Sequence, residues 1–66
     1  MQITINGQSR TVGESFSVAD LLLELKLEPR RVAVERNKQL VPRKQFASAP
    51  LADGDVLEIV TLVGGG

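Results

Sequence analysis

Polar and apolar residues alternate along the first dozen positions, which is the pattern of strands that bury one face. Residues 2–6 read Gln-Ile-Thr-Ile-Asn, and residues 9–12 read Ser-Arg-Thr-Val. Asn6-Gly7 stands between the two runs, and both residue types tolerate the positive φ angles of a tight hairpin turn. The chain is therefore predicted to begin with a β-hairpin.

The apolar spacing then changes to steps of three and four, which indicates an amphipathic helix. Ser17 precedes this segment and Asp20 follows three residues later, which is the spacing of a capping box. Pro29 cannot continue a helix, so we expect an end near Lys26 or Leu27, with Lys26 in the last turn. The stripe predicted to face the core consists of Val18, Leu21, Leu22 and Leu25.

The middle of the chain contains two further strand patterns. Residues 31–36 and residues 39–41 are predicted strands, joined by a turn at residues 37–38. Pro42 ends the second strand because it cannot donate to a sheet ladder. Residues 43–46 are predicted to form one helical turn after that proline.

An Asp53-Gly54 turn is predicted to lead into the last strand, residues 56–63, which is rich in β-branched and aliphatic residues. A hairpin, a crossover helix and further strands build a mixed sheet with the helix on one face, and the last strand should lie parallel beside the first. We therefore predict an α+β fold of the β-grasp type, with four to five strands and one main helix. Residues 1–62 would form this domain, and residues 63–66 a flexible glycine tail.

The last strand is apolar on both faces, although a sheet with a helix on one side buries only one of them. Leu57 and Ile59 share a face and are predicted to lie in the core. Val60 and Leu62 point to the other face, and together with Val63 they predict an exposed apolar patch beside the tail. Such a patch marks a contact with another protein.

The composition excludes most kinds of catalytic and metal site. The 66 residues contain no cysteine and no histidine, so zinc and thiol chemistry are excluded and the commonest general base is missing. Eight basic residues balance eight acidic ones, and two phenylalanines are the only aromatic residues, which argues against a nucleic-acid interface. No membrane span or signal peptide is indicated. We therefore expect a cytoplasmic protein that is not an enzyme.

The glycine tail is the most unusual feature of the sequence. Gly64, Gly65 and Gly66 directly follow an apolar strand, and four extended residues reach roughly 13 Å. Glycine has no Cβ, so Gly64 and Gly65 are expected to thread a channel too narrow for other residues. Gly66 is expected to end the chain and to present its α-carboxylate, which is ionised at neutral pH. For an arbitrary protein, a frayed terminus would be the simpler interpretation.

Several motifs together point to a known family. They are Val-Glu-Arg-Asn-Lys at residues 34–38, Val-Pro-Arg at residues 41–43, the segment from Leu51 to Val60 and the glycine end. With these motifs the chain resembles the ThiS family, the small sulfur carrier proteins of thiamine biosynthesis, which have a ubiquitin-like β-grasp fold. Phe46 departs from the pattern, since many relatives are expected to carry tryptophan there, and this affects packing alone.

The resemblance implies that Gly66 carries the sulfur. An ATP-dependent, E1-like activating enzyme would adenylate its carboxylate. A sulfur donor such as a cysteine desulfurase would then displace AMP and leave a thiocarboxylate, from which thiazole synthase would receive the sulfur. The carrier itself would bind no cofactor and no metal.

Three alternatives follow from the same features. The sulfur carrier of molybdopterin synthesis has the same fold and a Gly-Gly end, a ubiquitin-like modifier would be joined to lysines through Gly66, and a plain interaction module would make no use of its glycines. The basic pairs Arg30-Arg31 and Arg43-Lys44 are candidates for docking an acidic partner, although each pair alone is more typical of an ordinary solvent-facing surface.

Overall fold

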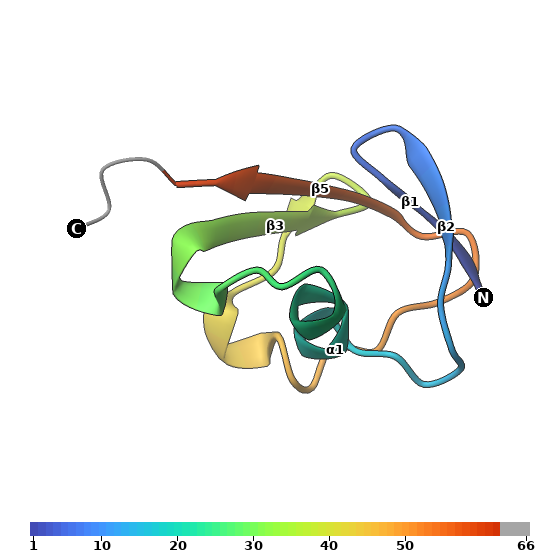
Figure 1. Ribbon diagram of the computed structural model, residues 1–66, viewed down its shortest axis with the longest axis horizontal. Coiled ribbons are helices and arrows are strands. Elements are labelled where there is room, and N and C mark those ends of the chain that lie inside the picture. The colour runs from blue at the N-terminus through green and yellow to red at the C-terminus, as the bar shows by residue number, and fades with distance from the viewer. Residues whose placement is uncertain (63–66) are drawn as a thin grey trace.

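The computed structural model describes residues 1–62, which fold as a five-stranded sheet with one α-helix on one face (Figure 1). This architecture confirms the predicted α+β fold and its order of elements. A 3-10 turn before the third strand was not predicted, so that strand begins one residue later than expected. The elements are β1 Gln2–Ile5, β2 Gln8–Thr11, α1 Val18–Glu24, η1 Pro29–Arg31, β3 Val32–Arg36, β4 Gln39–Leu40, η2 Arg43–Gln45 and β5 Val56–Thr61.

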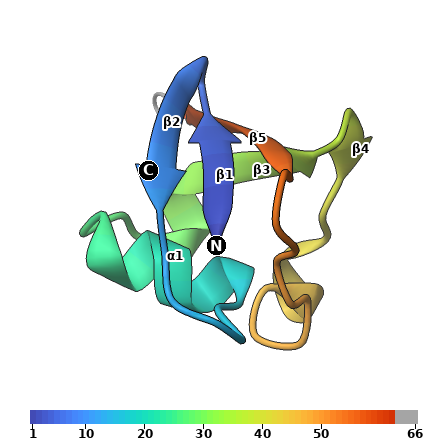
Figure 2. The same ribbon diagram turned by 90° about the vertical axis from the view of Figure 1, so that its right-hand side faces the viewer.

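The sheet is mixed, and β5 lies at its centre. The strand order is β2-β1-β5-β3-β4. The first strand pairs with β5 in parallel, with Thr4 opposite Val56, and β3 pairs with β5 antiparallel, with Val32 opposite Thr61. Figure 2 shows the β1–β2 hairpin beside these strands, with α1 below the sheet. The predicted parallel pairing of the first and last strands is therefore confirmed.

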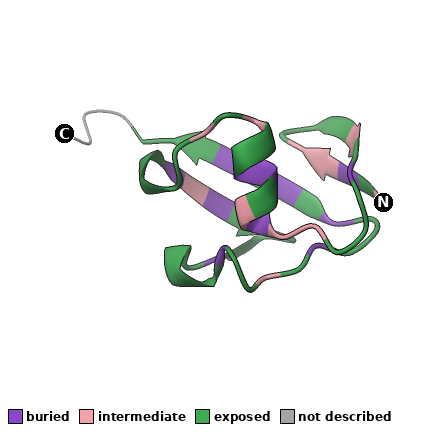
Figure 3. Cartoon of the chain, turned by 60° about the horizontal axis from the view of Figure 1, so that its bottom comes forward, coloured by how far each residue is buried: buried purple, intermediate pink, exposed green. Residues whose placement is uncertain are grey.

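The core lies between α1 and the face of the sheet that the helix covers (Figure 3). Leu21 and Leu22 of the helix and Leu57 of β5 are completely buried, and each contributes roughly 1.5–3 kcal/mol relative to an exposed side chain. Leu23 lies off the apolar stripe and is 79% exposed, as its position predicts. The other buried apolar residues are Ile3, Val12, Val18, Val32, Val34, Val41, Phe46, Leu51 and Ile59.

The start of α1 confirms the capping box, whereas its predicted end is wrong. The Ser17 hydroxyl accepts a hydrogen bond from the Asp20 amide, and the Asp20 carboxylate accepts one from the Ser17 amide. The helix ends at Glu24, because Lys26 adopts a left-handed conformation with φ of 61°. The Leu27 amide then donates to the Leu22 carbonyl, which is the bond pattern of a Schellman motif. Lys26 therefore lies outside the last helical turn.

Two hairpin turns place asparagine side chains against the central strand. Asn6 and Asn37 both have positive φ angles, as do the residues that follow them, which is typical of type I′ turns. The Asn6 side chain both donates to the carbonyl and accepts from the amide of Ile59. The Asn37 side chain accepts from the Val56 amide. These asparagines extend the backbone pairing of β5 on both of its sides.

The Asp-Gly-Asp segment before β5 forms a tight, bonded turn. Gly54 has a φ angle of 87°, and its amide donates to the Gln2 carbonyl at 2.7 Å. Asp53 accepts a hydrogen bond from the Gln2 amide. Asp55 is only 8% exposed, and its carboxylate accepts from the side-chain amide of Asn37 and from the backbone amide of Ala52. This turn therefore aligns the start of β5 with β1 and with the second hairpin.

We expect Gly54→Ala to lower the free energy of unfolding by about 1–2 kcal/mol, because a residue with a Cβ is strained in the left-handed region. A Cβ at this position would meet no atom within 4 Å, so the loss would come from the backbone alone. Gly13→Ala is the matched control, because a Cβ at Gly13 would lie 3.8 Å from the Phe16 ring in ordinary contact. Urea unfolding midpoints measure both changes, and equal midpoints would show that Gly54 is an ordinary turn residue.

Candidate functional site

The end of β5 is the part of the described structure from which the glycine tail continues. Thr61 is still paired with Val32 of β3, and the Leu62 amide donates to the Arg31 carbonyl at 2.7 Å. The sheet therefore holds the chain up to Leu62. Val63 and the predicted tail residues Gly64, Gly65 and Gly66 lie outside the described residues.

The two faces of β5 are as different as the sequence predicted. Leu57 and Ile59 face the core, with exposures of 0% and 9%, whereas Val60 and Leu62 are 58% and 44% exposed. The face assignment is therefore confirmed. Val56 is exposed on the same side, and we refer to Val56, Val60 and Leu62 as the outer strip. Contact of Val60, Leu62 and Val63 with a partner stays a prediction.

The sequence interpretation missed one apolar residue on this outer face. Leu40 of β4 is 67% exposed, and it lies opposite Glu35 of β3. The signal was present in the chain, because Leu40 and Val41 are adjacent apolar residues of a predicted strand and their side chains must point to opposite faces. The apolar surface therefore reaches beyond β5 to the edge of the sheet.

Two carboxylates interrupt the apolar surface. Glu35 and Glu58 are directly opposite each other on β3 and β5, and both are exposed. Like charges in this arrangement are unfavourable for a sheet. In the described part of the chain neither carboxylate takes part in an ion pair. The outer face thus combines apolar side chains with a negative centre.

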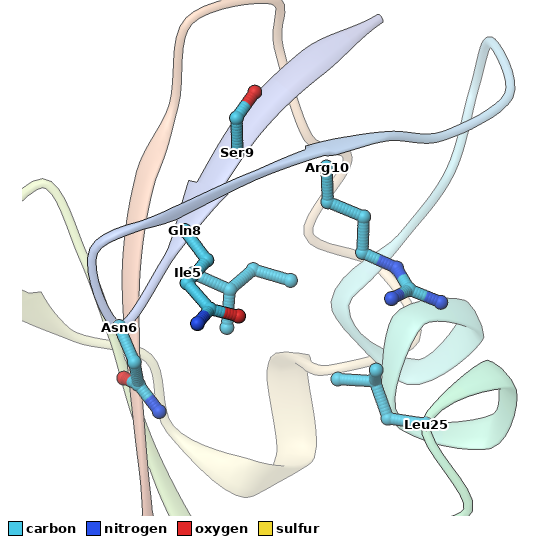
Figure 4. A pocket seen from close by; sticks show the side chains of 6 residues that line it. All are labelled: Ile5, Asn6, Gln8, Ser9, Arg10 and Leu25. Carbon is cyan, nitrogen blue, oxygen red and sulfur yellow. The ribbon is translucent and has the colours of Figure 1, made fainter.

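A hollow lies beside the first hairpin (Figure 4). Its volume is about 200 Å³, which is below the range of about 300–1,000 Å³ that is usual for ligand pockets. Arg10 is its only charged group, and this guanidinium is already paired with Glu24 at 2.7 Å. The hollow therefore offers no acid or general base, and its one hydroxyl, that of Ser9, donates a hydrogen bond to the Gln2 side chain at 3.0 Å. Its lining consists of Ile5, Asn6, Gln8, Ser9, Arg10 and Leu25.

The chemistry of the described residues is limited in other respects as well. Over residues 1–62, no group of three or more acidic, histidine or cysteine side chains gathers in a way that would hold a metal ion. Across the same range, no helix has the length and apolar character needed to cross a membrane. The described residues form a sheet whose last strand, β5, continues into the tail. The exposed outer strip lies along that strand.

Comparisons with known proteins agree on one family. The model of the ThiS family matches residues 3–66. The sulfur carrier protein ThiS of Bacillus subtilis is 44% identical over 53 residues, which is 80% of this chain and 80% of that protein. A crystal structure of the thiamine biosynthesis protein ThiS from Geobacter metallireducens matches with a TM-score of 0.85 and 38% identity, and it covers 100% of both chains.

A different kind of relative is much longer. The thiazole synthase of Paramagnetospirillum magneticum is 47% identical over 66 residues, which is 100% of this chain but 20% of that protein. The thiazole synthase of Magnetococcus marinus also matches over 20% of its length. The chain therefore spans about a fifth of the length of these two relatives.

Proposed function

This chain belongs to the ThiS family, and from that membership we propose that it is a sulfur carrier of thiamine biosynthesis. The sulfur would be held as a thiocarboxylate on Gly66. The observation that supports this best is the position of β5, since a strand flanked on both sides gives the glycine tail a rigid base. The match to thiazole synthases over the whole of this chain supports thiazole synthase as the acceptor of the sulfur.

The proposed chemistry needs no catalytic side chain in the carrier. A carboxylate is a poor electrophile, because its charge repels nucleophiles and oxide is a poor leaving group. The Gly66 carboxylate therefore attacks the α-phosphate of ATP and releases pyrophosphate, which leaves an acyl adenylate. A donor persulfide then attacks the acyl carbon and AMP departs with the bonding electrons. A thiol next cleaves the S–S bond of the resulting acyl disulfide, which leaves the thiocarboxylate and joins the thiol to the donor sulfur as a disulfide. The carrier presents the group and its partners perform the chemistry, as for other group carriers.

In this proposal an E1-like activating enzyme adenylates Gly66, and a donor such as a cysteine desulfurase supplies the sulfur. The test is intact-mass analysis of the protein before and after incubation with ATP, the activating enzyme and the sulfur source. The starting mass shows whether Gly66 carries a free carboxylate. An oxygen-to-sulfur exchange on the peptide that ends in Gly66 supports the proposal. An unchanged mass contradicts it, and an isopeptide bond to a lysine would instead identify a ubiquitin-like modifier.

The outer strip is proposed as the surface that the activating enzyme contacts. Val60 and Leu62 are exposed directly before the tail, so a partner that receives the tail would cover them. We expect Leu62→Asp to weaken the complex at least about tenfold, because a charge would replace a desolvated apolar contact. The thermal melt of the free protein should remain nearly unchanged, since Leu62 is 44% exposed.

Calorimetric titration with the activating enzyme measures this change. Leu23→Asp is the matched control, because Leu23 is an exposed leucine on α1, at 79%, and lies away from the outer strip. Equal affinities for the two variants would contradict the assignment of this surface.

A further inference from the structure

The fold brings together two basic pairs that are separate in the sequence. The Arg43 side chain donates from Nε to the Pro29 carbonyl at 3.1 Å and from Nη2 to the Arg30 carbonyl at 3.3 Å. This contact fixes η2 against η1, and both turns lie at the end of the molecule where β5 finishes (Figure 1). We call the exposed residues Arg30, Arg31, Arg43 and Lys44 the basic patch.

The positive charge of the basic patch is not balanced locally. Among residues 1–62, the ion pairs join Arg10 to Glu24 and the N-terminal amine to Glu14, and no residue of the patch takes part. Glu28 is the only carboxylate in the two segments that carry the patch. Since the formal net charge of the whole chain is zero, this end of the molecule is positive while other parts are negative.

Part of the basic patch lies beside the residue from which the tail continues. The Arg31 carbonyl accepts the hydrogen bond of the Leu62 amide at 2.7 Å, so η1 is adjacent to the last described residue. The four residues after Leu62 span roughly 13 Å when fully extended. In the proposed reaction the Gly66 carboxylate meets the phosphates of ATP. The distance from these phosphates back to Leu62, beside the basic patch, would then be roughly 13 Å. A partner that receives the tail would therefore face these cations from the surface around the point of entry.

We propose that the basic patch docks against an acidic rim on the activating enzyme, around the opening through which the tail enters. This inference rests on the proposed function and adds the electrostatic character of the partner. Opposite charges on two surfaces accelerate their association and select their orientation. The acidic rim would face the basic patch and not Glu35 and Glu58 on the outer face, so the carrier approaches with its basic end leading.

The test uses two pairs of charge-removing substitutions in the intact protein. Arg30→Gln with Arg31→Gln removes two charges from the basic patch, and within residues 1–62 both arginines contribute to hydrogen bonds through backbone groups alone. The matched control, Arg10→Gln with Lys38→Asn, removes two charges from β2 and from the second hairpin. Asparagine tolerates the positive φ angle of Lys38, and the pair of Arg10 with Glu24 is exposed, so its loss costs little.

Association with the adenylating enzyme of the same genome is measured by stopped flow at about 0.1 M and about 1 M salt, where the Debye length is about 10 Å and about 3 Å. At the lower salt concentration we expect the Arg30/Arg31 variant to associate about tenfold more slowly than the native protein. It should also lose most of the salt dependence, with little change in the dissociation rate. The control should stay within about twofold of the native rate, and both variants should melt normally.

The outcomes separate this inference from the proposed function. If both variants associate equally fast while the native protein still forms a thiocarboxylate, the acidic rim is excluded and the sulfur carrier stands. If the native protein neither binds the enzyme nor forms a thiocarboxylate, the proposed function fails and the docking inference fails with it.

Discussion

Replacing Gly65 with valine is expected to abolish thiocarboxylate formation, or to slow it at least about a hundredfold, while the domain stays folded. Gly65 is one residue before the proposed reacting carboxylate. A branched side chain stiffens the backbone and enlarges the part of the chain that must enter the channel. An error of about 1 Å at a reacting centre is enough for a hundredfold loss of rate. Gly65 follows residues 1–62, which form the described fold, so we expect the free energy of unfolding to change by no more than about 0.5 kcal/mol.

ATP–pyrophosphate exchange measures the first chemical step, and a thermal melt of the same sample measures stability. Gly65→Ala is a graded control, because it adds a methyl group without branching and should retain intermediate activity. Deletion of Gly66 should have the same effect as Gly65→Val, because the terminal carboxylate would then end one residue short of the α-phosphate of ATP. Formation of thiocarboxylate at the native rate by both the valine and the deletion variants would refute the carrier function.

Asp55→Ala is expected to destabilise the domain by about 2 kcal/mol, because hydrogen bonds to a charged acceptor contribute about 1.5–3 kcal/mol. The carboxylate accepts from Asn37 at 3.1 Å and from Ala52 at 2.8 Å, and the residue is 8% exposed. For a domain of this size the melting temperature should fall by roughly 8–16 °C. A large fraction of the total stability would be lost, since domains are stable by only about 5–15 kcal/mol.

Asp53→Ala is the matched control for this change. Asp53 accepts one exposed hydrogen bond, from the Gln2 amide at 2.7 Å, so its loss should cost about 1 kcal/mol or less. Differential scanning calorimetry on both variants compares two aspartates of the same turn. Equal melting temperatures would show that the buried carboxylate of Asp55 contributes no more to stability than the exposed carboxylate of Asp53.

The acidic pair on the outer face and the basic patch required knowledge of the fold. Glu35 faces Glu58 because β3 and β5 pair in one particular register, which no local pattern specifies. Arg43 reaches the carbonyls of Pro29 and Arg30 across a gap of 13 residues or more. The sequence shows which residues are charged, but it does not show which residues lie next to them in the fold.

The end of α1 shows the same limit on a smaller scale. The chain turns at Lys26 with a positive φ angle, a position where glycine is the usual signal. Because this position holds lysine and not glycine, the sequence gives no sign that the helix ends here. The prediction relied instead on Pro29, the next helix-breaking residue, and therefore placed the end of the helix too far along the chain. The two hydrogen bonds that close the helix, from Lys26 and Leu27, compensate for the strained residue.

The sequence by itself determined the elements whose causes lie within a few residues of one another. The Asn6-Gly7 turn, the Ser17 capping box and the alternation that sends Leu57 to the core depend on local geometry, and the structure confirms all three. Only the tertiary structure decided which distant groups share a surface, because long-range pairing places residues by register and packing. Long-range contacts of this kind join Arg31 to Leu62 and Arg43 to the carbonyls of Pro29 and Arg30, so that the two basic pairs become neighbours.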